Sequence, residues 1–221
     1  MESRVIHLRR PPTLIQQDDV FVPPQATGPV LDQVQQRWEA LCAANPAFFD
    51  GRLLHVLGVH RNGHGGASLH VADCAYRFYA VQNETFDLGV RPLGVKGVVI
   101  GERGVLMGLR SDSVAAYPRC WEFAPGGVIE PNEPPEAVIE RELREETALR
   151  MGRPPVALAV VYDPVVRSWE LVYEVSVRPG RFVANPAEYD ELRWCGRGAL
   201  PAPRSEVTEQ ILGVLGPRRT G

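Results

Sequence analysis

The sequence predicts an α/β/α sandwich preceded by a small α+β extension, and three observations lead to this prediction. The chain has 221 residues, which is enough for one catalytic domain and an additional unit. Hydrophobic residues make up 44% and charged residues 23%, as in globular proteins that bury a core. Strand-like and helix-like segments are mixed after Pro92, where the pattern changes. We therefore expect an extension at residues 1–91 and a catalytic domain at residues 92–221.

The extension begins with an arm whose two Pro-Pro pairs favour extended or turn structure. Apolar residues at helical spacing then predict an amphipathic helix over residues 29–45. Two β-rich segments, 51–60 and 67–73, flank the turn RNGHGG and predict a hairpin. A short helix is expected over residues 73–82. Together these segments make a small α+β unit.

The catalytic domain is predicted to mix strands and helices around one sheet. Residues 94–110 form two apolar strands around a Gly-Glu-Arg-Gly turn. A loop, a Gly-Gly turn and a long charged helix follow. Two further strands are expected at residues 154–163 and 168–178, and a last helix at residues 205–215. One sheet with helices on both sides is the α/β/α sandwich.

The charge and composition of the chain limit the classes of partner that it can bind. The net charge of −3 excludes the broad basic surface that duplex DNA or an anionic membrane requires. No leader-like stretch opens the chain, and no run of about 18 apolar residues occurs. The four cysteines form no CxxC pair, so a zinc ribbon is not indicated. We expect a cytoplasmic protein that acts on a small molecule.

Three glutamates of the charged helix point to metal chemistry. Glu142, Glu145 and Glu146 stand at i, i+3 and i+4, so their side chains share one helix face and repel one another. Mg²⁺ prefers carboxylate and phosphate oxygens and would relieve this repulsion. The alternative is a solvated helix face in which Arg141 and Arg144 pair with the glutamates.

The surroundings of the helix favour the metal site. Pro134 and Pro135 suit a first helical turn, and the preceding Gly126 and Gly127 let the backbone approach phosphate closely. Apolar residues anchor the opposite face of the helix to the core. The loop, helix and acidic cluster therefore form one rigid unit.

This segment resembles the Nudix box, GX₅EX₇REUXEEXGU, in which U is a bulky aliphatic residue. The match runs from Gly127 through Glu133 and Arg141 to Leu149, and departs from the pattern only at the last glycine, which is Ala148. The resemblance implies a Nudix-type sandwich and a hydrolase that cuts a diphosphate linkage with Mg²⁺ or Mn²⁺.

The resemblance also implies roles for individual residues. Glu142, Glu145 and Glu146 would bind the metal together with the carbonyl of Gly126. Glu145 or Glu146 would also activate water, and Arg141 would orient these carboxylates. Glu133 and Gly127 would support the site. A fourth carboxylate outside the box is expected at Glu191, or else at Glu188.

Further residues are candidates for substrate binding. Arg110 and Arg119 flank the loop before the box and could bind phosphate, although each could equally be a surface residue. Trp121 and Glu122 belong to a lead-in, WEFAPGG, that carries an extra Ala124 relative to the family. Ala148 tolerates a positive φ poorly, so we expect the helix to run one residue longer than usual.

The expected substrate is a nucleoside diphosphate linked to another moiety, NDP-X, such as a nucleotide sugar or an ADP-ribose-like compound. The stretch NPAFFDGRLLHV resembles the Nudix branch that hydrolyses UDP-glucose and similar nucleotide sugars. The alternatives are a nucleotide-sensing module, which the intact glutamates disfavour, a nucleoside triphosphate pyrophosphatase, and an isopentenyl-diphosphate isomerase-like enzyme. The extension either sets specificity, covers a sheet edge or builds a homodimer interface.

Overall fold

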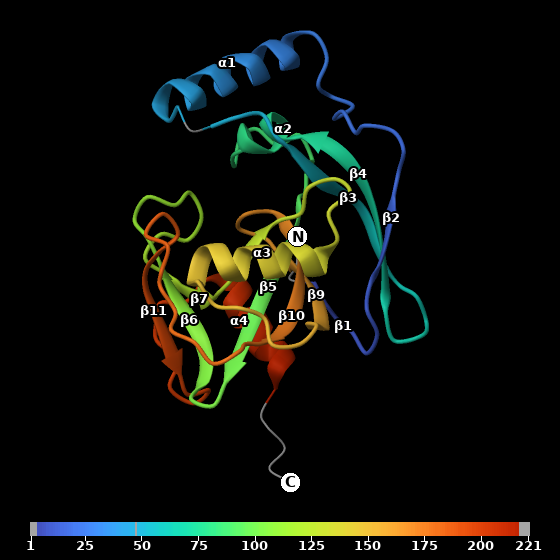
Figure 1. Ribbon diagram of the computed structural model, residues 1–221. Helices are drawn as coiled ribbons and strands as arrows, with labels where there is room; N and C mark the ends of the chain where they lie inside the picture. The colour runs from blue at the N-terminus through green and yellow to red at the C-terminus, as the bar shows by residue number, and fades with distance from the viewer. Residues whose placement is uncertain (1–3, 47, 217–221) are drawn as a thin grey trace.

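The computed structural model describes residues 4–46 and 48–216, which form two β-sheets and four helices (Figure 1). The larger sheet has eight strands, and its main path runs β1-β9-β10-β5-β6-β11. Strand β7 pairs with β6, and β8 pairs with β5. The bounds of these strands are β1 Val5–His7, β5 Leu93–Gly101, β6 Gly104–Arg110, β7 Trp121–Phe123, β8 Gly126–Val128, β9 Val156–Asp163, β10 Ser168–Ser176 and β11 Tyr189–Cys195.

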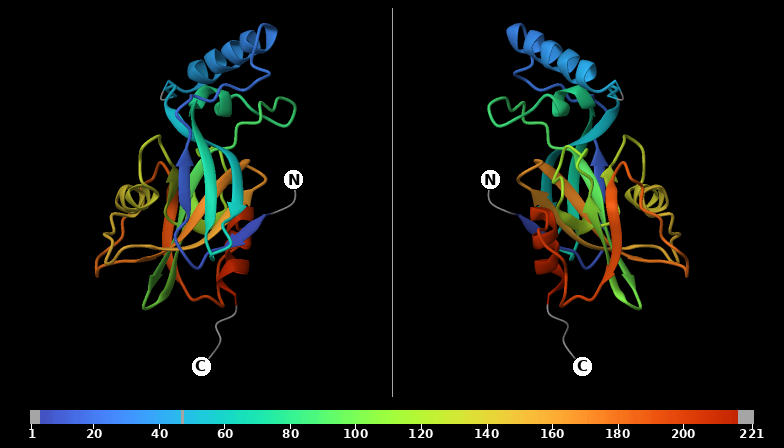
Figure 2. Two further views of the ribbon diagram at one scale, coloured as in Figure 1. Left: turned by 90° about the vertical axis from the view of Figure 1, so that its right-hand side faces the viewer. Right: turned by 90° about the vertical axis from the view of Figure 1, so that its left-hand side faces the viewer.

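Two helices cover the larger sheet on opposite faces, which confirms the α/β/α sandwich. Helix α3, Pro135–Thr147, packs against β5 and β8, and helix α4, Glu206–Leu215, packs against β9, β7 and β1 (Figure 2). The central strands β5 and β10 are parallel to each other and are rich in valine. Such runs are expected where a strand is buried on both faces.

The second sheet belongs to the extension and follows the order β2-β4-β3. Its strands are β2 Thr13–Gln16, β3 Arg52–Arg61 and β4 Ala67–Ala75. Strands β3 and β4 form the expected hairpin. Helix α1, Pro29–Ala44, matches the first predicted helix. Helix α2, Tyr76–Ala80, is shorter than predicted, because residues 73–75 belong to β4. Both helices lie at the end of this sheet, uppermost in Figure 1.

The extension and the larger sheet share one hydrophobic core. Leu54 and Val71 of the small sheet are buried in the same cluster as Val95 and Ile139. The backbone N–H of Leu54 also donates to the carbonyl of Ile129 at 3.1 Å. Continuous packing of this kind makes the two sheets one structural body.

The first strand crosses from the extension into the larger sheet. Val5–His7 pairs antiparallel with Ala159–Val161 of β9, although its residues fall within the predicted extension. The boundary between residues 91 and 92 stays a prediction. Residues 1–3 and 217–221, the ends of the two predicted domains, lie outside the described residues, as does residue 47.

The end of helix α3 corrects one expectation. Instead of running one residue longer, the helix ends at Thr147, and Ala148 adopts a left-handed conformation with φ 60°. Its N–H donates to the carbonyl of Arg144 at 3.0 Å, which closes the last turn. Leu149 is then buried in the core, and this burial fixes the direction of the chain after the helix. The expected longer helix is therefore wrong.

None of the helices in the described part of the chain combines the length and apolar character needed to cross a bilayer.

Candidate active site

Charged side chains gather in a cleft beside the Gly-Gly loop. The cleft has a volume of about 320 Å³ and lies between β5, β8, β10 and helix α3. Carboxylates outnumber cations among its described lining residues, so the cleft favours a bound cation and disfavours a free anion. Its charged lining residues are Lys96, Arg110, Glu122, Glu142, Glu146, Asp163, Glu170 and Glu188.

Helix α3 presents two of its glutamates to the cleft and a third largely to solvent. Glu146 is only 4% exposed and the side chain of Glu142 14%, whereas that of Glu145 is 51% exposed. Burial raises the pKa of Glu146 to about 8, an effect that Lys96 opposes and Glu142 reinforces. Burial also raises the pKa of Glu142, against the attraction of Arg141. Both inward carboxylates would therefore be stabilised as anions by a nearby cation.

The Gly-Gly loop approaches these groups so closely that side chains are excluded. A Cβ atom at Gly127 would lie 2.2 Å from Oε1 of Glu142, and one at Gly126 would lie 2.6 Å from Nζ of Lys96. The N–H of Gly126 donates to Oε2 of Glu146 at 3.2 Å. The absence of side chains thus lets the backbone form one wall of the cleft.

Arg141 holds the outer glutamates in place. Its Nε lies 3.1 Å from Oε1 of Glu133, and its Nη1 lies 2.7 Å from Oε1 of Glu142 and 3.5 Å from Oε2 of Glu145. The hydrogen bond to Glu133 is the main reason that the pKa of Arg141 is raised. A guanidinium with several fixed donors restricts the carboxylates it contacts. Arg141 can therefore orient Glu142 toward the cleft.

Two cations, Lys96 on strand β5 and Arg110 on strand β6, are fixed in the cleft by ion pairs. Nζ of Lys96 lies 2.9 Å from Oε1 of the buried Glu122, which also accepts a hydrogen bond from the hydroxyl of Tyr189 at 3.1 Å. Arg110 lies 2.8 Å from Glu188 and 3.6 Å from Glu122. Burial acts to lower the pKa of Lys96, but the combined attraction of Glu122, Glu170 and Glu146 raises it above the usual value. Lys96 is therefore held as a cation inside the cleft.

Comparison with known proteins assigns this arrangement to a family. The model of the NUDIX domain matches residues 90–212. The chain belongs to the Nudix hydrolase family. It is 31% identical over 107 residues to the NAD-capped RNA hydrolase NudC of Stutzerimonas stutzeri (strain A1501). That alignment covers 45% of this chain and 38% of the relative, so the chain spans well under half of the relative's length.

One solved structure with a TM-score of 0.50 supports the Nudix fold. The MutT NUDIX hydrolase from Burkholderia pseudomallei superposes with a TM-score of 0.50 at 24% identity, over 56% of this chain and 97% of that one. DR0079 from Deinococcus radiodurans gives a TM-score of 0.47 at 20% identity, over 56% of this chain and 83% of that one.

The Nudix box runs from β8 through the turn before α3 and along the helix. Gly126, Gly127, Glu142 and Glu146 line the cleft. Glu133 instead lines a neighbouring cavity, where it contacts Arg141. Glu145 and Arg141 do not line the cleft, but Arg141 contacts Glu142 and Glu145. The structure therefore brings the box residues together, with Glu146 and Glu142 innermost.

Three candidates outside the box lie in the cleft and three do not. Arg110, Glu122 and Glu188 line it. Glu191, which the sequence ranked above Glu188, lies on β11 and forms an ion pair with Arg193 at 2.6 Å. The shift in register of β11 near this position separates the two glutamates. The cleft therefore favours Glu188 as the additional carboxylate.

Trp121 and Arg119 are the other two candidates outside the cleft. Trp121 is 6% exposed and packs in the core beneath α4, where Arg193 covers its ring. Arg119 has a side chain that is 55% exposed and pairs with Asp190. Trp121 and Glu122 are consecutive residues of strand β7, so their side chains point to opposite faces of the sheet, and Glu122 lines the cleft. The substrate contacts expected of Trp121 and Arg119 stay predictions.

Sequence analysis missed Lys96 and Glu170 as site residues. Glu170 lies on β10, and a Cβ atom at Gly94 of the adjacent strand would be 2.5 Å from its Oε2. The hydroxyl of Ser168 donates to Glu170 at 2.6 Å. Burial raises the pKa of Glu170 to about 7, against the attraction of Lys96. The available signal was a charged residue inside each of two largely apolar strands, because a charge is rarely buried without a partner.

The donor chemistry of the cleft suits a hard divalent cation. Its available ligands are carboxylate and backbone oxygens, which Mg²⁺ prefers. Within the described residues, no three His, Cys, Asp or Glu side chains yet stand close enough together to hold a metal ion. The exposed Glu145 is the box member whose side chain would have to turn inward. The chemical type of these ligands therefore fits a divalent cation.

Proposed function

We propose that this protein hydrolyses the diphosphate linkage of a nucleoside diphosphate bound to another moiety, NDP-X, with the help of Mg²⁺ or Mn²⁺. One observation carries the proposal. The Nudix-box glutamates Glu142 and Glu146 and the two fixed cations Lys96 and Arg110 line the same cleft, beside a backbone that is bare at Gly126 and Gly127. Carboxylates for a metal and cations for phosphate thus converge on one volume.

The electrostatic balance of the cleft supports a requirement for metal. A diphosphate entering alone would meet more carboxylates than cations. Glu142, Glu145 and Glu146, with the carbonyl of Gly126, would hold the metal, and Glu133 would support them through Arg141. When bound, the metal would neutralise phosphate charge and lower the pKa of a coordinated water.

The chain's own residues then have distinct tasks. Lys96 and Arg110 bind the diphosphate oxygens and stabilise the negative charge that develops on them. Arg141 orients Glu142. Glu146 or Glu145, as a carboxylate, accepts the proton of the attacking water. Glu146 is the stronger candidate of the two because it is buried against the Gly126 backbone, whereas Glu145 is half exposed.

The NDP-X class is supported by the relative and by the shape of the site. The NudC protein is named for action on NAD-capped RNA, and NAD is itself two nucleosides joined by a diphosphate. A second cavity of about 330 Å³ adjoins the cleft and offers space beyond the diphosphate. A nucleotide sugar or an ADP-ribose-like compound would need such space.

The deciding experiment compares kcat/KM of the full chain for UDP-glucose, ADP-ribose and dGTP, with Mg²⁺, with Mn²⁺ and with chelator. We expect hydrolysis of an NDP-X compound that disappears in chelator and returns with either metal. Activity that survives chelation would contradict the proposed site, and a clear preference for dGTP would favour a triphosphate pyrophosphatase. Tight nucleotide binding without release of product would favour a sensing module.

A further inference from the structure

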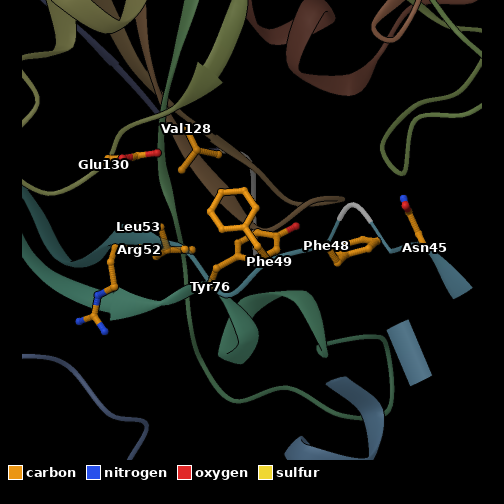
Figure 3. A pocket seen from close by; sticks show the side chains of 9 residues that line it. Asn45, Phe48, Phe49, Arg52, Leu53, Tyr76, Val128 and Glu130 are labelled. Carbon is orange, nitrogen blue, oxygen red and sulfur yellow. The ribbon is translucent and has the colours of Figure 1, made fainter. Parts of the chain in front are cut away.

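An aromatic cavity adjoins the catalytic cleft and shares a wall with it. Phe48, Phe49 and Tyr76 of the extension line this cavity together with Val128 and Glu130 (Figure 3). Val128 also lines the cleft. Val128 follows Gly127 directly, and neighbouring residues of a strand are about 3.3 Å apart. The cavity therefore begins at about this distance from the Gly-Gly loop, which one ribose ring can span. The cavity and the cleft therefore meet at one residue, Val128.

The loop that carries Phe49 is held by backbone hydrogen bonds, although the ring of Phe49 faces solvent. Phe49 is 72% exposed. Its carbonyl accepts from the N–H of Gly51 at 3.0 Å, and the carbonyl of Gly51 accepts from the N–H of Tyr76 at 2.9 Å. A Cβ atom at Gly51 would lie 2.8 Å from the ring of Phe49, so glycine is needed for the ring to lie there. The loop therefore fixes an apolar ring in an exposed position.

Flat surfaces and one carboxylate define what the cavity can bind. The rings of Phe48 and Tyr76 stack with centroids 6.4 Å apart and planes inclined by 20°. Arg52 on the rim is engaged by Asp73 at 2.6 Å, whereas the side chain of Glu130 forms no hydrogen bond or ion pair within the described part of the chain. A planar aromatic group with N–H donors on its edge would satisfy both features.

We infer that this aromatic cavity, bounded by Phe49, Tyr76 and Val128, holds the nucleobase of the substrate, an inference that rests on the proposed NDP-X hydrolysis. The diphosphate then lies in the cleft, and the base stacks on Phe49 with its N–H edge toward Glu130. Stacking on aromatic rings accepts any base because every base has a π-face. The extension thereby contributes directly to substrate recognition.

Binding without catalysis tests this directly. We expect the full chain to bind AMP and UMP at least about tenfold more tightly than ribose 5-phosphate, since stacking on one aromatic ring has an effect of this order. Phe49→Ala should abolish the difference, and Phe49→Trp should retain it. Leu57→Ala removes an exposed apolar side chain from the same extension and should change nothing. Equal binding of AMP, UMP and ribose 5-phosphate by the unaltered chain would overturn the inference.

Kinetics separate this inference from the proposed function. For the preferred NDP-X compound, Phe49→Ala should raise KM about tenfold and leave kcat within about threefold. An unchanged KM in a chain that hydrolyses NDP-X would refute the base site alone. A chain that binds AMP through Phe49 but cuts no diphosphate would refute the proposed function alone. If Phe49→Ala changed the self-association of the chain on sedimentation and left nucleotide binding unchanged, the cavity would instead be assigned to contact with a second copy.

Discussion

At the scale of single residues, burial distinguishes the glutamates of the Nudix box. Glu146 is 4% exposed and contacts the Gly126 backbone, whereas the Glu145 side chain is 51% exposed. We predict that Glu146→Gln lowers kcat by a factor of about 100 or more, as expected when a metal ligand or base is lost. Glu145→Gln should retain less than about a tenth of the activity.

The matched control for these variants is Glu140→Gln on the outer side of the same helix. Glu140 is exposed and does not line the cleft, so the variant should keep its kcat and its melting temperature. Steady-state kinetics and thermal unfolding of the three variants give the comparison. Glu145→Gln with more than a tenth of normal turnover would remove Glu145 from the proposed ligand set.

His55 is the residue whose protonation should affect stability most clearly. It is 5% exposed, and its Nδ1 accepts the N–H of Arg91 at 2.9 Å. Burial lowers its pKa to about 4. The unfolded chain, with a histidine pKa of about 6.5, therefore binds more protons than the folded chain between these values. The contribution of His55 to the free energy of unfolding is therefore fully present above about pH 6.5, and it is lost as the pH falls toward 4.

From this shift we expect His55 to contribute a loss of about 2 kcal/mol in the free energy of unfolding between pH 7.5 and pH 5. Urea unfolding at the two pH values measures it. In His55→Asn the amide oxygen can replace Nδ1 as acceptor but cannot titrate, so the loss should shrink by that amount. An equal loss in both proteins would show that His55 does not titrate as the structure implies.

At the scale of secondary-structure elements, helix α3 ends under backbone strain. Ala148 has φ 60°, a conformation that costs a residue with a Cβ atom about 1–2 kcal/mol. Ala148→Gly should therefore stabilise the protein by about 1 kcal/mol and raise the melting temperature by about 2–4 °C. Ala137→Gly, within the same helix, should destabilise it. Calorimetry that shows a lower melting temperature for Ala148→Gly would contradict the left-handed cap.

Elements were predictable where their signal is local. The spacing of apolar residues predicted α1, and the RNGHGG turn predicted the β3–β4 hairpin. The pairing of β1 with β9 was not predictable, because it joins segments about 150 residues apart in sequence and depends on the packed sheet. A strand of three residues, two of them apolar, carries too little pattern to assign a partner strand.

The candidate site also contains some residues that the sequence predicts and others that it does not. Glu142 and Glu146 were predictable because helical spacing places them on one face and the box fixes their identity. Lys96 and Glu170 required the parallel register of β5 with β10, which places Glu170 beside Gly94. The choice of Glu188 over Glu191 required the irregular register at the start of β11. Long-range strand register is the information that single-sequence patterns lack.

At the scale of the whole molecule, the shared core couples the extension to the catalytic sheet. Leu54 is 2% exposed and packs in the cluster that also contains Val95 and Ile139. A contact that spans both sheets transmits a loss of packing in one to the other. The extension should therefore not unfold on its own before the catalytic sheet, and the chain should lose structure in one transition.

Leu54→Ala tests this coupling. Removing a fully buried leucine should cost about 2–5 kcal/mol. Because Leu54 also donates its backbone N–H to Ile129, the loss should lower the stability of the whole chain and not that of the extension alone. Urea unfolding followed by far-UV circular dichroism and by tryptophan fluorescence should give coincident curves shifted to lower urea. Leu57 lies on the same strand and is 46% exposed. Leu57→Ala should therefore change the free energy of unfolding by less than about 0.5 kcal/mol. Two separate transitions, with only the first moved by Leu54→Ala, would show that the extension and the catalytic sheet are independent.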